Sequence, residues 1–136
     1  MKSAGSASRH LSVHVDRTVE EVYAYASDPA NLPAWARGLG GSITRIDGRW
    51  VAESSPMGRV EVAFVPRNDL GVLDHDVTLP SGETFHNPVR VIPDGSGSEV
   101  VFTLRRQPGT SDADFERDAD TVAADLDRLR EILESA

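Results

Sequence analysis

The segment from Leu73 to Ile92 holds the side chains best suited to chemistry in this sequence. It contains His75 and His86, and histidine is the residue type suited to acid–base chemistry near neutral pH. Its one arginine, Arg90, is a permanent cation that binds carboxylates, phenolates and carbonyls. A turn centred on Ser81-Gly82 predicts an antiparallel hairpin in which Val77 lies opposite His86. In that register one face combines these groups with apolar side chains, in the order Leu73, His75, Val77, Leu79, His86, Arg90 and Ile92.

If this face is directed inward, it forms the polar end of an apolar ligand site. A buried cation is costly unless it is paired, so an inward Arg90 requires an anionic or strongly polar partner. His75 is then the candidate general acid or base. The alternative is a one-residue slip, or a bulge at Pro88, that leaves Arg90 in solvent beside a carboxylate. That register turns the opposite side chains inward, namely Phe85, Val89 and Val91. The sequence leaves both registers open and also allows structural roles for both histidines.

Apolar side chains on other predicted elements could line the same site. Two strands alternate apolar and polar residues around Val62 and Phe102, which is typical of a sheet with one buried face. Trp35 follows a short helix and could close the mouth of a cavity, although a core role is the commoner one. The complete predicted ligand-binding set is Trp35, Val62, Phe64, His75, Val77, His86, Arg90, Phe102, Val122 and Leu126.

No pattern in the sequence indicates a metal, a cofactor or a nucleophile–base pair. Asp74, His75 and Asp76 are adjacent, but neighbouring strand residues point to opposite faces, so a His–His–carboxylate site would need ligands from elsewhere. The acidic residues from Asp112 to Asp125 lack the glycine-broken spacing of a calcium loop. The chain has no cysteine, which excludes thiolate catalysis and disulfides. We therefore expect neither a metal nor a cofactor.

Length and charge narrow the classes of function. The 136 residues have the size of one domain, and the net charge of −8 disfavours binding to nucleic acid and to anionic membrane surfaces. No apolar run has the length of a membrane span. We expect a cytoplasmic protein without membrane insertion, monomeric or homodimeric, with a flexible tail at 1–9 and a single domain at 10–136.

The predicted elements begin with one strand and two short helices. Apolar alternation predicts a strand from Leu11 to Val15. Thr18 and Glu21 form a capping box that starts a helix reaching about Ser27. Asp28-Pro29 combines an N-cap with a proline at the first helical position, which predicts a second short helix.

The rest of the chain is predicted as strands followed by a long helix. Strands are expected at 43–46, 50–53, 60–65, 72–79, 85–92 and 100–105, joined by turn residues and therefore antiparallel. The last helix begins near Ser111 and carries one apolar stripe, formed by Phe115, Ala119, Val122, Leu126, Leu129 and Leu133.

This order of elements resembles the helix-grip superfamily of START, birch-pollen-allergen and polyketide cyclase/dehydrase domains. The segments Val15-Asp-Arg-Thr-Val-Glu-Glu-Val22 and Ser27-Asp-Pro-Ala-Asn-Leu-Pro-Ala-Trp35 are similar to the start of bacterial SRPBCC proteins. The resemblance extends from about His10 to Glu134. It implies an α+β helix-grip fold, in which a curved antiparallel sheet of about seven strands wraps around the C-terminal helix and encloses a ligand cavity.

The resemblance implies a class of fold more strongly than a reaction, because members bind lipids, sterols, quinones, hormones and polyketides and only some are enzymes. No known catalytic set of the family matches this sequence. The first hypothesis is therefore binding of a small hydrophobic molecule that is lipid-, polyketide- or isoprenoid-like. The alternative is a polyketide cyclase, aromatase or dehydratase in which His75 moves a proton and Arg90 polarises a carbonyl. A third is an interaction domain whose interior is filled by its own side chains.

Overall fold

The computed structural model describes residues 7–39, 41–54 and 58–136. Its first part is a strand followed by short helices and 3-10 turns. Their bounds are β1 (Ser8–Val15), α1 (Val19–Ala26), η1 (Pro29–Asn31), α2 (Leu32–Trp35) and η2 (Arg37–Leu39). β1 begins two residues before the predicted domain start at His10, and residues 1–6 of the predicted tail lie outside the described residues.

The caps that the sequence predicted start the first helices. The Thr18 hydroxyl oxygen accepts the Glu21 backbone N–H at 3.2 Å, and a carboxylate oxygen of Asp28 accepts the Ala30 backbone N–H at 3.0 Å. These side chains satisfy backbone donors that a helix start leaves unpaired. The short helices therefore begin where the capping residues place them.

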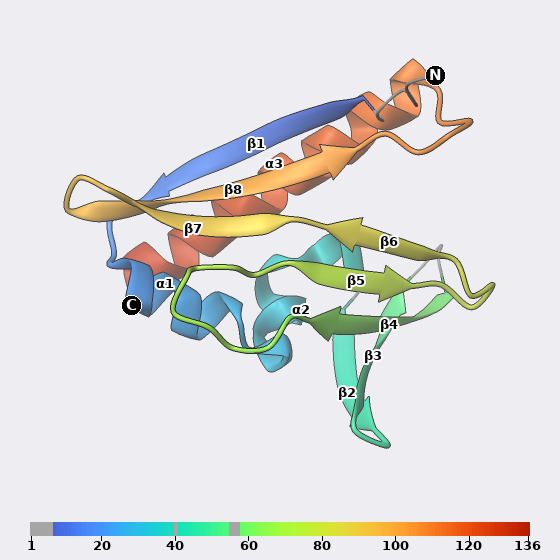
Figure 1. Cartoon of the computed structure of the whole chain (residues 1–136), viewed down its shortest axis with the longest axis horizontal. Helices are drawn as coiled ribbons and strands as arrows, with labels where there is room; N and C mark the ends of the chain where they lie inside the picture. The colour runs from blue at the N-terminus through green and yellow to red at the C-terminus, as the bar shows by residue number, and fades with distance from the viewer. Residues whose placement is uncertain (1–6, 40, 55–57) are drawn as a thin grey trace, which may run out of the picture.

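Seven further strands complete the sheet region: β2 (Ser42–Ile46), β3 (Arg49–Ser54), β4 (Gly58–Phe64), β5 (His75–Thr78), β6 (Thr84–Asn87), β7 (Val89–Asp94) and β8 (Gly97–Arg105). All paired strands are antiparallel, in the orders β2-β3-β4-β5-β6 and β1-β8-β7. Figure 1 shows β6 and β7 end to end between β5 and β8, so the two groups form one curved surface.

Pro88 divides the single strand that was predicted at 85–92 into β6 and β7. Proline has no N–H to donate to a neighbouring strand, so the ladder is interrupted at this residue. Backbone hydrogen bonds resume directly afterwards, from Leu73 N–H to the Val89 carbonyl at 2.8 Å and from Val91 N–H to the Gly71 carbonyl at 2.9 Å. The sheet therefore has eight strands in place of the predicted seven, and it continues across the break.

The long helix α3 (Asp112–Ser135) lies across the concave face of the sheet, behind β1, β8 and β7 in Figure 1. The Ser111 side chain caps its first turn by accepting the Asp114 backbone N–H at 3.1 Å. Most of the predicted apolar stripe is buried, at Ala119, Leu126, Leu129 and Leu133. The predicted α+β helix-grip fold is thus confirmed, with α1 and α2 packed at one end of the sheet.

The core lies between the sheet and the helices. Val15 from β1, Val22 from α1, Val100 from β8 and Leu129 from α3 are fully buried and belong to one apolar cluster. Among the described residues, no helix is both long enough and apolar enough to cross a bilayer.

Candidate functional site

A small cavity of about 130 Å³ lies inside the grip, between the sheet, α2 and α3. The short helices, the strands β5, β6 and β8, and α3 each contribute to its wall. The lining residues are Leu32, Trp35, Ala36, Leu39, His75, Asn87, Phe102, Thr121, Val122, Asp125 and Leu126. The fold thus holds a mainly apolar pocket with a few polar groups between the sheet and α3, where the helix-grip fold predicts one.

Five of the predicted ligand-binding residues line this cavity, namely Trp35, His75, Phe102, Val122 and Leu126. Val62 and Val77 point to the same side of the sheet but belong to the packed core, where they are 3% and 4% exposed. Phe64 also packs there, with its ring 5.1 Å from the ring of His75. These three residues therefore pack in the core beside the cavity and do not line it.

The predicted inward placement of His86 and Arg90 is wrong, because the hairpin has a different register. Val77 lies opposite Phe85, and Asp76 lies opposite His86. The connection between Leu79 and Glu83 is a three-residue loop whose last residue, Gly82, has φ of 91°. Such a loop is a type I turn followed by a left-handed residue, and it shifts the partner strand by one residue relative to a four-residue loop.

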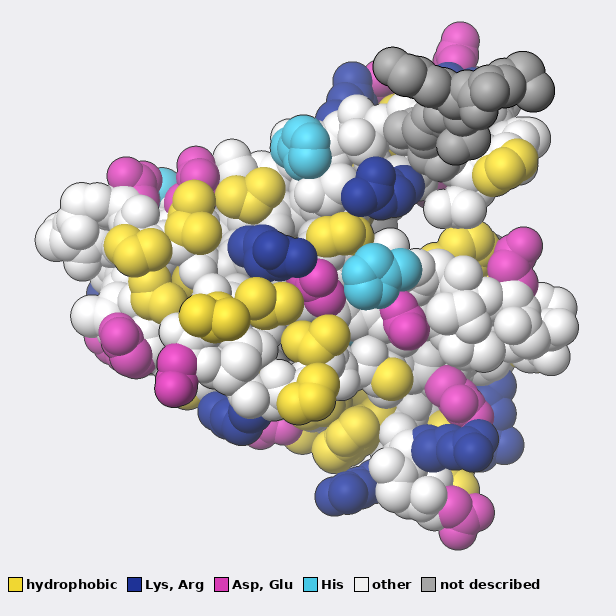
Figure 2. All heavy atoms as spheres, in the orientation of Figure 1, with side chains coloured by type: hydrophobic (Ala, Val, Ile, Leu, Met, Phe, Trp, Pro, Cys, Tyr) yellow, Lys and Arg dark blue, Asp and Glu magenta, His cyan; other side chains and the backbone are white. Residues whose placement is uncertain are grey.

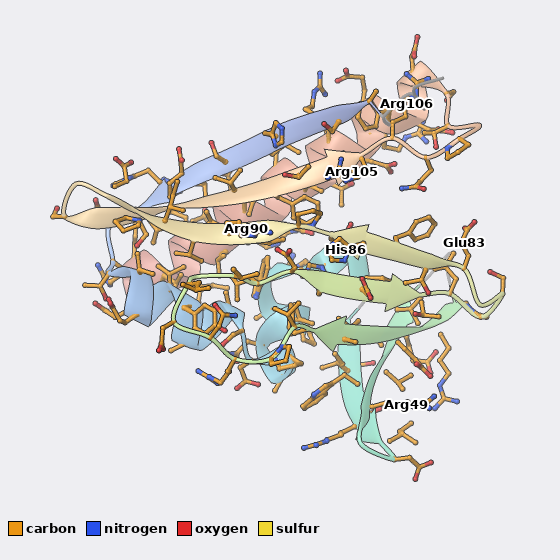
Figure 3. All side chains as sticks on the ribbon, viewed as in Figure 1. Arg49, Glu83, His86, Arg90, Arg105 and Arg106 are labelled. Atoms are coloured by element: carbon orange, nitrogen blue, oxygen red, sulfur yellow. The ribbon has the colours of Figure 1, made fainter. Side chains whose placement is uncertain are left out.

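The shift turns His86 and Arg90 to the outer face of the sheet. Figure 3 labels both side chains on the side of the sheet away from α3. The alternative register of the sequence analysis is confirmed, since Val89 and Val91 are each 2% exposed and Arg90 lies beside the carboxylate of Asp74. Arg90 therefore cannot meet a ligand in the cavity.

The side chain of Asp74 stabilises the sheet where Pro88 interrupts its backbone hydrogen bonds. One of its carboxylate oxygens accepts the Val89 backbone N–H at 2.9 Å, and the pair of oxygens accepts two hydrogen bonds from the Arg90 guanidinium at 2.9 and 2.8 Å. The hydrogen bond from Arg90 lowers the pKa of Asp74, which outweighs the opposite effect of burial. This buried carboxylate is structural, and sequence reasoning missed it.

The outer face of the sheet, around the Asp74–Arg90 ion pair, carries both charged and apolar side chains. Figure 2 shows acidic, basic and histidine side chains there, interspersed with apolar ones. A larger hollow of about 790 Å³ lies on this face beside the β2–β3 hairpin, where Figure 3 labels Arg49. Arg49 and Arg59 are strongly exposed and lie 3.3 Å from Glu61 and 3.6 Å from Glu53. This hollow is thus lined by ion-paired side chains and lacks the mainly apolar lining of the inner cavity.

His75 is the buried polar residue in the inner wall of the grip. Its Nδ1 lies 3.2 Å from the Leu73 carbonyl oxygen, and its Nε2 lies 3.5 Å from Nδ2 of Asn87. Its ring stands edge-on between Phe64 and Phe102, at centroid distances of 5.1 and 6.3 Å. Burial lowers the pKa of His75, so the imidazole is neutral near pH 7.

The hydrogen-bond partners identify the tautomer of this imidazole. A carbonyl oxygen only accepts, so Nδ1 of His75 carries the proton and donates it to Leu73. Nε2 then carries the lone pair of the ring, which accepts from the Asn87 amide over a long contact of 3.5 Å. The cavity wall thus offers a neutral nitrogen base, which can accept a hydrogen bond or a proton.

Several polar lining residues were missed by the sequence analysis. Asn87 faces His75 across the β5–β6 pair, and only the three-residue loop reveals this pairing. Thr121 and Asp125 lie one turn apart on α3 beside the predicted residue Val122. Asp125 is ion-paired with Arg128, whose Nε donates to the Trp35 carbonyl at 3.4 Å. These contacts tie α2 to α3 beside the cavity.

Trp35 forms part of the wall with its ring, and it is 6% exposed. Its Nε1–H is buried without a hydrogen-bond acceptor among the described residues. The predicted role of Trp35 as a gate stays a prediction, while its position in the cavity wall is observed. No group of metal-binding side chains occurs in the described ranges 7–39, 41–54 and 58–136.

Comparison with solved structures agrees with this fold. The Aha1 dimer from Colwellia psychrerythraea is similar with a TM-score of 0.73 and 13% identity, over 94% of this chain and 96% of that one. A Deinococcus radiodurans protein has a TM-score of 0.64 and 23% identity, over 94% and 97% of the two chains. A norcoclaurine synthase point mutant from Thalictrum, in complex with a transition-state analogue, has a TM-score of 0.63 and 13% identity, over 98% and 97%.

At these sequence identities, the similarity to the solved structures establishes the fold of this chain and carries no information about its activity. No curated protein matches the chain. Residues 6–134 match the family described as polyketide cyclase/dehydrase and lipid transport, which is nearly the whole chain. The protein therefore belongs to the polyketide cyclase/dehydrase and lipid transport family, within the SRPBCC/START-like helix-grip superfamily.

Proposed function

We propose that the protein binds one small hydrophobic molecule in the cavity between the sheet and α3. The observation that carries this proposal is a mainly apolar pocket inside the fold whose wall contains a neutral, buried imidazole. Apolar pockets with few, well-placed polar groups are typical of small-molecule sites. The family description, which includes lipid transport, is consistent with an apolar ligand.

The first experiment is a titration of protein labelled with ¹³C at its methyl groups, with toluene as a neutral apolar probe. We expect shifts in the methyl signals of Leu32, Val122 and Leu126, which line the cavity. Val122→Phe fills the space and should weaken binding at least about tenfold, because the cavity is no larger than one small ring.

The matched control is Val101→Phe, which makes the same change on the outer face of β8, opposite Arg90. It should leave toluene binding unchanged. Shifts scattered over the surface, or equal affinity in both variants, would refute binding in the cavity.

The second candidate is an enzyme of the cyclase or dehydratase kind. It is favoured by one observation, the unprotonated Nε2 of His75 at an apolar wall, whose contact to the Asn87 amide is long and which therefore suits a general base. Arg90 has no part in it, because this side chain lies on the outer face.

The test of the enzyme hypothesis uses a metabolite extract incubated with the native protein and with His75→Gln. Mass spectrometry reads bound ligands on the protein and new products in the extract. Product formation that disappears in the variant while ligand binding remains supports an enzyme. Bound ligand without any product, in both proteins, leaves binding as the function.

A further inference from the structure

The polar groups of the cavity wall constrain the chemistry of its ligand, on the basis of the function proposed above. His75 commits its Nδ1–H to the Leu73 carbonyl, so only Nε2 is available. The contact from Nε2 to the Asn87 amide is 3.5 Å, which is long for an N–H···N hydrogen bond. The wall therefore contains an acceptor that the protein itself uses weakly.

The charges around the cavity disfavour an anion. No lysine or arginine occurs among the described residues that line it, and Asp125 contributes a carboxylate. Arg128 is ion-paired with Asp125 and also donates to the Trp35 carbonyl, while Arg90 is bound to Asp74 on the outer face. A carboxylate or phosphate inside would lose its hydration and would find no lysine or arginine among the described lining residues, next to a carboxylate that is already ion-paired.

The volume limits the size of the ligand. The cavity measures about 130 Å³. A dry apolar cavity of about 150 Å³ in another protein holds one benzene molecule, whereas sites for drug-sized ligands occupy about 300–1,000 Å³. The pocket therefore fits a single ring or a short branched chain, and a longer molecule would have to extend past the rim at Thr121, which is exposed.

We propose that the cavity selects a neutral, single-ring phenol, or an alcohol of similar size, whose hydroxyl group donates a hydrogen bond to Nε2 of His75. The ring then lies among Trp35, Phe102 and Leu126, and the hydroxyl approaches the His75–Asn87 pair. A hydroxyl donor replaces the long Asn87 contact with an ordinary hydrogen bond to Nε2, whereas an isosteric ligand without a donor leaves Nε2 with the long contact alone.

The experiment compares four probes of similar size by the same methyl-labelled titration at pH 7.5: phenol, toluene, anisole and benzoate. Phenol is neutral at this pH and can donate, toluene and anisole cannot donate, and benzoate is an anion. We expect phenol to bind about fivefold more tightly than toluene or anisole, which is the worth of one ordinary hydrogen bond. Benzoate should bind at least about tenfold more weakly than phenol.

Two variants identify the acceptor. His75→Phe keeps an aromatic ring beside Phe64 and Phe102 but removes Nε2, so toluene binding should persist while the advantage of phenol disappears. Asn87→Leu keeps His75, so the advantage of phenol over toluene should remain. A phenol preference that survives in His75→Phe and vanishes in Asn87→Leu would overturn the assignment of the acceptor to His75.

The outcomes also separate this inference from the proposed function. If toluene and phenol bind equally in the cavity of the native protein, the selectivity for a donor is refuted while the binding function stands. If benzoate binds as tightly as phenol, the exclusion of anions is refuted. If no probe shifts the cavity methyl groups, or if Val122→Phe has no effect on any of them, the proposed function itself fails.

Discussion

Between the rings of Phe64 and Phe102, His75 is held in one tautomer by the Leu73 carbonyl. The titratable neighbours Asp74, Asp76 and His86 lie on the opposite face of the sheet, whereas Asp125, ion-paired with Arg128, lines the same cavity from α3. Burial is the dominant influence on this imidazole and lowers its pKa from the ordinary value of 6.5. A single residue thus combines a structural hydrogen bond with an available lone pair.

This lowered pKa predicts that the protein loses stability on mild acidification. The unfolded chain takes up a proton at His75 near pH 6.5, whereas the folded chain resists it, so the free energy of unfolding falls as the pH falls below 6.5. The slope from this one group is at most about 1.4 kcal/mol per pH unit. Urea titrations of the native protein and of His75→Gln between pH 7.5 and 5.0 check this, with a flatter profile expected for the variant.

His14 provides a control, because its pKa is shifted in the direction opposite to that of His75. Its two ring nitrogens contact Asp94 at 2.9 Å and Asp16 at 3.0 Å, and chiefly the hydrogen bond to Asp94 raises its pKa. Its contribution is complete below pH 6.5 and is lost as the pH rises through its raised pKa. His14→Gln should therefore lower the free energy of unfolding by a constant amount below pH 6.5, and its profile should converge with that of the native protein as the pH rises through the raised pKa. The slope of the acid limb, which is assigned to His75, should stay unchanged. An acid limb that persists unchanged in His75→Gln would contradict the assignment to His75.

At the scale of elements, the junction of β6 and β7 decides which face each side chain of the hairpin takes. The left-handed Gly82 closes a three-residue loop, and Pro88 then ends the pairing with β5. Asp74 supplies the acceptor that the Val89 N–H would otherwise lack. The curved sheet therefore depends at this point on one buried carboxylate.

Asp74→Ala should destabilise the protein by about 2 kcal/mol, mainly because the buried Val89 N–H loses its acceptor. Arg90 contributes little to this loss, since half of its side chain is in solvent and regains hydration. The matched control is Asp76→Ala, which removes an exposed partner of His86 and should cost less than about 0.5 kcal/mol. Chemical denaturation of both variants measures the difference, and equal losses would refute the capping role.

At the scale of the whole molecule, α3 serves both as core and as cavity wall. Leu129 is fully buried in the apolar cluster, whereas Leu126 lines the cavity. The apolar stripe of α3 thus stabilises the packing of the helix on the sheet and limits the volume of the cavity between them.

Leu126→Ala should enlarge the cavity, so that naphthalene competes with toluene in the variant but not in the native protein. We expect a cost of about 2–4 kcal/mol in unfolding free energy, as for other buried leucines. Leu129→Ala is the matched control, because it should cost a similar amount without admitting the larger ring. Naphthalene binding equally well to both variants would place it outside the cavity.

The sequence by itself determined the elements whose signals are local. The Thr18–Glu21 capping box, the Asp28-Pro29 start, the apolar stripe of α3 and the alternation in most strands act within a few residues, and together they carry the resemblance to the helix-grip superfamily. Five of the ligand-binding residues that were predicted from these elements line the cavity in the structure.

Only the tertiary structure decided the rest of the site. The side-chain period of a strand is two residues, so the choice between a three- and a four-residue loop around Ser81-Gly82 exchanges the two faces of the hairpin. That choice moved His86 and Arg90 outward and brought Asn87 opposite His75. The cavity volume follows from how α2, α3 and the sheet pack, which depends on contacts between residues far apart in the chain. Sequence patterns report local preferences, and the packing of distant elements is not among them.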